Sequence, residues 1–129
     1  MRSLALGAAA LVLSATAGLA EFRIAFEWGD IPLCTTGRPN VVPSPAFSIT
    51  DLPAGTTSVQ FKLKDFDAPR YNHGGKTLGI SQSGVLPVGV FTYKSPCPPS
   101  GVHTYEWTAT AKKGSQVLGV AKARRTYPE

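Results

Sequence analysis

The sequence predicts an all-β protein, folded as an antiparallel β-sandwich with few or no helices. Several stretches alternate apolar and polar residues, which is the pattern of a strand with one buried face. Beyond residue 20, no stretch keeps the three- and four-residue apolar spacing of an amphipathic helix. The 129-residue chain also holds 13 glycines and 11 prolines, and those that lie between the alternating stretches predict turns. Strands that are buried on one face and joined by turns pack as two layered sheets.

Three alternating stretches predict the long strands. Their apolar positions, which we expect to face inward, are Phe22, Ile24, Phe26 and Trp28 in the first, Val59, Phe61 and Leu63 in the second, and Tyr105, Trp107, Ala109 and Ala111 in the third. Further strands are expected near residues 46–50, 89–93 and 117–126. Residues 112–115 (KKGS) separate the last two long strands and predict a β-hairpin.

Residues 1–20 have the composition of a secretory signal peptide. One early arginine precedes an apolar, alanine-rich stretch, and small residues follow up to Ala20, after which we expect cleavage. A membrane-spanning interpretation is weaker, because the apolar stretch is short and no charge cluster follows it. Residues 21–129 then make one domain of ordinary size. We therefore expect an exported protein, periplasmic or secreted, with at most peripheral membrane contact.

Cys34 and Cys97 are the two cysteines of the chain. An exported protein folds in an oxidising compartment, where an even number of cysteines favours a disulfide. The bond would close a loop of about 60 residues and contribute roughly 4 kcal/mol of stability. Two free, buried thiols are the alternative. The chain has no Cys/His spacing typical of structural zinc, so we predict neither a metal nor a cofactor.

The charge of the chain is mildly positive. Without Arg2, the formal net charge of +5 becomes +4 for residues 21–129. So small an excess, in an exported chain, argues against nucleic-acid binding. Five basic residues lie in or near the C-terminal hairpin, namely Lys112, Lys113, Lys122, Arg124 and Arg125. We interpret them as a solvated hairpin surface, the alternative being a docking surface for an acidic partner or for anionic lipid headgroups.

Strand parity brings charged side chains to the end of the predicted sandwich. Asp65 and Asp67 share odd parity with the inward positions of 59–63, and His103 shares parity with those of 105–111. In an antiparallel pair, the end of one strand lies beside the start of the other. We therefore expect an inward carboxylate and an imidazole to meet at one rim. The alternative is an Asp–His pair or a turn cap that serves structure alone.

Two motifs in this region resemble those of the phosphatidylethanolamine-binding protein family, which includes the Raf kinase inhibitor proteins. The first is D-x-D-A-P, found as DFDAP at residues 65–69. The second is G-P-x-P-P-x-G-x-H-x-Y, found as SPCPPSGVHTY at residues 95–105, with Ser95 in place of the first glycine. The resemblance covers most of residues 34–127, and both motifs occur in the family's order.

The resemblance implies an antiparallel β fold with a small anion pocket at one end of the main sheet. In the family, that pocket accepts phosphate-like or carboxylate groups. Carried over residue by residue, it implies the ligand-binding positions Asp65, Asp67, Pro69, His73, Pro98, His103 and Tyr105. His73 stands where the family has a histidine followed by tryptophan, whereas Gly74 follows here, so the pocket is expected to be more open.

The function predicted from these features is that of an exported protein that binds a small anionic ligand. No catalytic role is predicted, because the chain contains neither a G-x-S-x-G nor an H-E-x-x-H motif and the resemblance is to a binding family. Two alternatives stay open: a protein-interaction module that inhibits or regulates a partner, and, with less support, a metal-dependent enzyme that uses the aspartates and histidines.

Overall fold

The computed structural model describes residues 20–129, so the predicted signal peptide lies outside the described residues except for Ala20. In the described part, the strands are β1 (Arg23–Phe26), β2 (Val41–Pro43), β3 (Phe47–Thr50), β4 (Ser58–Asp65), β5 (Gly75–Leu78), β6 (Gly84–Leu86), β7 (Thr92–Lys94), β8 (His103–Lys113) and β9 (Gln116–Tyr127). There is no helix among these residues, and hence none that could cross a membrane.

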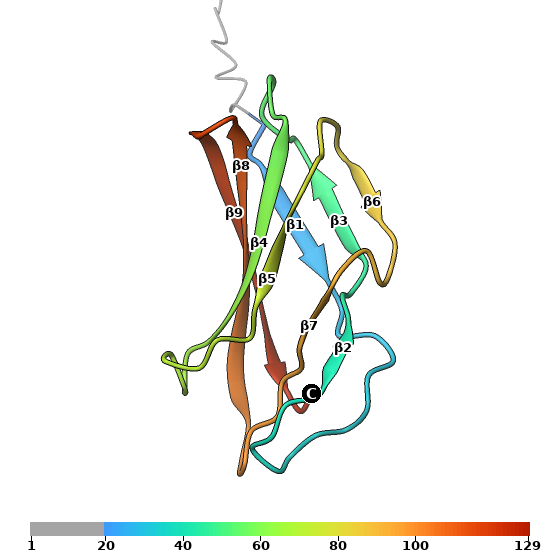
Figure 1. The fold of residues 1–129 in the computed structure, drawn as a ribbon, viewed down its shortest axis with the longest axis vertical. Helices are drawn as coiled ribbons and strands as arrows, with labels where there is room; N and C mark the ends of the chain where they lie inside the picture. The colour runs from blue at the N-terminus through green and yellow to red at the C-terminus, as the bar shows by residue number, and fades with distance from the viewer. Residues whose placement is uncertain (1–19) are drawn as a thin grey trace, which may run out of the picture.

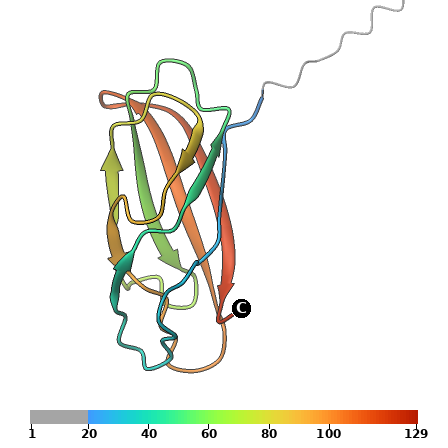
Figure 2. The ribbon, with the colours of Figure 1, turned by 90° about the vertical axis from the view of Figure 1, so that its right-hand side faces the viewer.

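The strands form two layers, which are seen edge-on in Figure 1 and face-on in Figure 2. The main sheet has the order β5-β4-β8-β9, and the opposite layer contains the sheet β1-β3-β6 together with the ladder β2-β7. Every strand pair is antiparallel. The predicted all-β, antiparallel sandwich is therefore confirmed.

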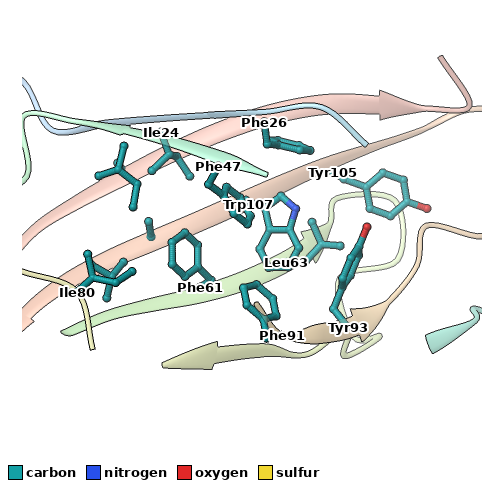
Figure 3. Packing of buried hydrophobic residues seen from close by; sticks show 14 of the residues in the cluster. Ile24, Phe26, Phe47, Phe61, Leu63, Ile80, Phe91, Tyr93, Tyr105 and Trp107 are labelled. Atoms are coloured by element: carbon teal, nitrogen blue, oxygen red, sulfur yellow. The ribbon is translucent and has the colours of Figure 1, made fainter. Parts of the chain in front are cut away.

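An aromatic core fills the space between the layers. Phe47, from the second sheet, packs against Phe61 and Trp107 of the main sheet, with ring centroids 4.6 and 5.3 Å apart. Figure 3 shows this cluster, with Tyr93 and Tyr105 together at one end of it. All five side chains are at most 3% exposed. Large, fully buried rings of this kind supply most of the hydrophobic stabilisation of a small domain.

The register of the main sheet sets which residues meet at its end. Asp65, the last residue of β4, lies opposite Tyr105 of β8, and His103, the first residue of β8, lies opposite Tyr127 of β9. The chain segments 29–40, 66–74 and 95–102 surround this end of the sheet, which is the lower end in Figure 1. Their positions create a recess beyond the last core rings.

Cys34 and Cys97 form a disulfide at this end, with 4.6 Å between their Cα atoms. The predicted bond is confirmed, and the alternative of two free thiols is wrong, since the chain has no free cysteine. The bond holds segment 29–40 against the proline-rich turn of segment 95–102.

The strand expected near residues 89–93 is present as β7, but it starts later than expected. β7 begins only at Thr92, because Gly89 has a positive φ of 85° and the backbone there turns. Ser44 holds this turn, accepting hydrogen bonds from the backbone N–H groups of Gly89 and Phe91 at 2.9 and 3.1 Å. The short strands β2, β5 and β6 are absent from the sequence prediction, since three or four residues show too little alternation to be recognised.

Candidate functional site

Asp65 is the charged residue at the bottom of the recess. It ends β4 at an inward position and is only 3% exposed. Its Oδ2 accepts a hydrogen bond from His103 Nδ1 at 2.7 Å, and its Oδ1 accepts from the backbone N–H groups of Asp67 and Ala68 at 2.8 and 3.2 Å. A buried carboxylate is costly without partners, and here both oxygens have them. The meeting of Asp65 and His103 follows from strand parity, as predicted.

Asp67 does not share the inward direction that its parity predicts, so that expectation is wrong. The strand ends at Asp65, whose backbone carbonyl accepts a hydrogen bond from Ala68, and the resulting turn places Asp67 on the surface. Its Oδ2 accepts a hydrogen bond from the backbone N–H of Thr104 at 2.8 Å. Asp67 therefore ties the turn after β4 to the start of β8.

The two histidines have different hydrogen-bonded states. His103 Nδ1 carries a proton, because a carboxylate can only accept, and its Nε2 is left for other contacts. His73 is 2% exposed, and its Nδ1 donates to the Lys94 carbonyl at 2.8 Å. Burial lowers the pKa of His73, against the raising effects of that hydrogen bond and of the Asp65 charge. His73 is therefore neutral at pH 7, and its Nε2 is a hydrogen-bond acceptor.

Tyr105 has an unsatisfied hydroxyl. The side chain is fully buried, and its oxygen has no partner within hydrogen-bonding distance and angle among residues 20–129, although the Asp65 carboxylate and the Cys97 backbone are its nearest polar neighbours. Burial and the neighbouring negative charge of Asp65 raise the pKa of Tyr105, so the hydroxyl keeps its proton. A buried donor without a partner costs about 1–3 kcal/mol, which makes the position of this hydroxyl informative.

These side chains converge on a cavity of about 230 Å³. It is lined by Gly37, Pro39, Asp65, Ala68, Tyr71, His73, Cys97, Pro99, His103 and Tyr105. Drug-sized ligands occupy pockets of roughly 300–1,000 Å³. A cavity below that range suits a small polar group instead, such as a phosphate or a carboxylate.

Four of the seven residues expected at the site line the cavity: Asp65, His73, His103 and Tyr105. The other three lie elsewhere. Asp67 is exposed and bonds to the Thr104 N–H outside the cavity. Pro69 lines a groove on the other side of segment 66–74. Pro98 is fully buried, and its neighbour Pro99 lines the cavity instead.

One wall of the cavity comes from the segment that precedes β2. Gly37 and Pro39 line it, and the disulfide places them there by joining Cys34 to Cys97. Gly37 has a positive φ of 77°, and a Cβ at this position would lie only 3.2 Å from Pro99 Cβ. The signal available in the sequence was the disulfide itself, since pairing the two cysteines brings residues 35–40 to the proline-rich turn.

Asp65, Asp67 and His103 also offer a candidate cation cluster. One potential ligand atom from each lies within 4.8 Å of the others. However, both oxygens of Asp65, one oxygen of Asp67 and Nδ1 of His103 already take part in hydrogen bonds. A divalent ion would have to compete with the contacts that hold the turn after β4.

The lowered pKa of His73 predicts how stability changes with pH. Between its folded-state pKa and the ordinary value of 6.5, the unfolded chain binds more protons than the folded one, so acid favours unfolding. This contribution is complete above pH 6.5 and is lost as the pH falls towards the folded-state value. We expect the parent to lose more stability than His73→Asn between pH 7 and pH 5. Urea unfolding of both proteins over that range checks this, and parallel curves would contradict it.

The protein is similar to known proteins in its structure but not detectably in its sequence. No protein-family model matches the sequence, and no curated protein matches it significantly. Among solved structures, a phosphatidylethanolamine-binding protein homologue of Chlamydia trachomatis is similar, with a TM-score of 0.60, 18% identity and coverage of 84% of this chain and 98% of the other. E. coli YbcL, described as a member of the mammalian phosphatidylethanolamine-binding protein family, has a TM-score of 0.61 with the same identity and coverage. The chain therefore has the fold of the phosphatidylethanolamine-binding proteins.

Proposed function

We propose that this protein is an exported member of the phosphatidylethanolamine-binding protein family and binds a small anion, phosphate-like or a carboxylate, in the cavity at the end of the main sheet. The observation that carries the proposal is the hydroxyl of Tyr105. Three buried side-chain polar atoms lack a partner among residues 20–129, on Tyr93, Tyr105 and Trp107, and of these residues only Tyr105 lines the cavity. An anion oxygen in the cavity would satisfy it.

The neighbouring groups favour an anion that also carries a proton. Tyr105 can donate, and Nε2 of neutral His73, whose ring lines the cavity, can accept. A monohydrogen phosphate ion, which keeps one O–H at pH 7, offers both kinds of oxygen. The negative charge of Asp65 opposes an anion, but it is offset by His103 and two backbone N–H groups. Membership of the family is supported by the two motifs at residues 65–69 and 95–105, which flank the cavity, and by the shared fold.

We propose binding rather than catalysis. Asp65 is the side chain best placed to act as a general base, yet both of its oxygens are occupied by hydrogen bonds that hold the turn. Export is supported by the disulfide, because such bonds persist in oxidising compartments.

The test is a calorimetric titration of inorganic phosphate at pH 7. Tyr105→Phe removes the hydroxyl that the anion would satisfy, and we expect affinity to fall about tenfold or more, since a hydrogen bond to a charged group is worth roughly 1.5–3 kcal/mol. Tyr93→Phe is the matched control, because it deletes another unpaired, buried hydroxyl that does not line the cavity. Neither variant leaves a buried polar group behind, so both should fold.

Equal phosphate affinity in Tyr105→Phe and Tyr93→Phe would place the anion elsewhere, as would the lack of any phosphate binding by the parent. A parallel titration with Mn²⁺ addresses the cluster of Asp65, Asp67 and His103. If phosphate bound only in the presence of Mn²⁺, a metal-centred site would replace the direct contact to Tyr105.

A further inference from the structure

The outer face of the main sheet, which looks away from the core, carries the positive charge of the protein. Residues paired across β4, β8 and β9 share a face, and the charged ones on the outside are Lys62, Lys64, Lys112, Lys122, Arg124 and Glu106. Five cations and one carboxylate give this face a net charge of +4. Residues 21–129 as a whole also carry +4. The rest of the described molecule is therefore neutral overall.

A groove of about 530 Å³ lies on this face. Its floor is formed by β4 and β8, which contribute Gln60, Lys62, Lys64, Thr108 and Thr110, and its wall by the segment after β4, which contributes Arg70 and Tyr71. It is distinct from the smaller cavity, although Tyr71 lines both.

The cations of the groove differ from those beside it. Glu106 pairs with Arg124 at 2.7 Å and lies 3.9 Å from Lys122. In contrast, Lys62, Lys64 and Arg70 take part in no ion pair within residues 20–129. Glu106 lies opposite Lys64 in the strand register, but its carboxylate is paired with Arg124. The three groove cations therefore repel one another, and concave walls of lower dielectric focus their field. Such a groove attracts an anion.

We propose that the groove binds an acidic carbohydrate, a sugar chain that carries carboxylate, sulfate or phosphate groups. The cations would meet its acidic groups. The floor also offers neutral hydrogen-bonding groups that match sugar hydroxyls, namely the hydroxyls of Thr108 and Thr110 and the amide NH2 of Gln60, whose Oε1 accepts from Lys112 Nζ at 3.1 Å. Tyr71, 38% exposed at the wall, provides an apolar ring face for a sugar ring.

Other polyanions fit less well. A membrane surface would need large apolar anchors such as Trp, Phe or Leu. On this face Phe66 is held between Lys64 and Arg124, whose charged atoms lie 5.1 and 4.4 Å from its ring centroid, and the other exposed apolar side chains are Val117 and Val120. Single-stranded nucleic acid would need a row of aromatic platforms, and Tyr71 is the one aromatic residue lining the groove. This proposal does not depend on the anion cavity.

The test is a titration of a galacturonate tetrasaccharide into the parent and two double variants. Lys62→Gln with Lys64→Gln removes two charges from the groove. Lys94→Gln with Lys113→Gln removes two charges from exposed positions outside it and is the matched control. We expect affinity to fall at least tenfold in the groove variant and less than twofold in the control, since the charge-assisted contacts are lost only in the first. Binding by the parent should weaken as salt rises, and neutral maltotetraose should not bind.

Four results would overturn the proposal. These are no binding of the acidic sugar, equal loss of affinity in the two double variants, equal binding of maltotetraose, and binding of phosphatidylglycerol vesicles without binding of the sugar. The two sites can be told apart, because the groove variant should keep its phosphate affinity and Tyr105→Phe should keep its affinity for the sugar.

Discussion

Replacing Cys34 and Cys97 together by serine is expected to lower the free energy of unfolding by about 4 kcal/mol. The disulfide joins residues 63 positions apart, so its loss releases a long loop in the unfolded chain. For a domain of this size that loss corresponds to a fall in melting temperature of roughly 15 °C. Thermal unfolding of the parent and the double variant, followed by circular dichroism, measures it.

Reduction provides the control. Dithiothreitol should lower the melting temperature of the parent towards that of the double variant and leave the variant itself unchanged. Thiol labelling of the unfolded, unreduced parent should find almost no free sulfur. Quantitative labelling of both sulfurs, or a variant that melts within a few degrees of the parent, would show that the bond does not form.

Asp65→Ala is expected to destabilise the protein by about 3 kcal/mol, close to the cost of removing one partner of a buried ion pair. The change removes the acceptor of three hydrogen bonds, from His103 and from the backbone N–H groups of Asp67 and Ala68. Urea unfolding compared with the parent gives the value.

Asp67→Ala is the matched control for this prediction. Asp67 is exposed and accepts one hydrogen bond, from Thr104, so its loss should cost less than about 1 kcal/mol. Asp65→Asn, which keeps one acceptor, should fall between the two. If Asp65→Ala were as stable as Asp67→Ala, the buried carboxylate would not hold the turn.

The sequence predicts the long strands and the meeting of Asp65 with His103, because a strand alternates its faces with a period of two residues. Counting from Phe61 or Trp107 is enough to place both side chains inward. The same counting fails at Asp67, since it assumes that the strand continues. Only the hydrogen bonds of Asp65 to the following N–H groups show that the chain turns there.

The five basic residues of the hairpin show that closeness in the sequence does not predict a shared surface. They are neighbours in the chain, but the faces of the strands separate them. Lys112, Lys122 and Arg124 lie on the outer face, whereas Arg125 turns to the other side, where it donates to the Phe26 carbonyl and pairs with Glu129 at 2.9 Å. The five side chains therefore do not share one face, although Lys113, Lys122 and Arg124 are exposed, as the interpretation as a solvated surface expects.

The groove could not be predicted for a related reason. Lys62 and Lys64 are visible as outward positions of one strand, but Thr108 and Thr110 join them only through the register of β4 with β8. Arg70 joins them through the path of segment 66–74, whose turns have no periodic signal. The short β5 is similar: Gly75 is required there because a Cβ would lie 1.9 Å from the Phe61 carbonyl oxygen, a contact between residues 14 positions apart.

The uneven placement of charge gives the molecule an electric dipole whose axis crosses its two layers, with the positive pole on the outer face of the main sheet. In solution, a large anion exerts a torque on such a body before the two touch, so encounters begin with this face turned forward. The rate of association with a polyanion should consequently exceed that of an evenly charged protein with the same net charge. Raising the ionic strength shortens the reach of the field to a few ångströms and removes that advantage.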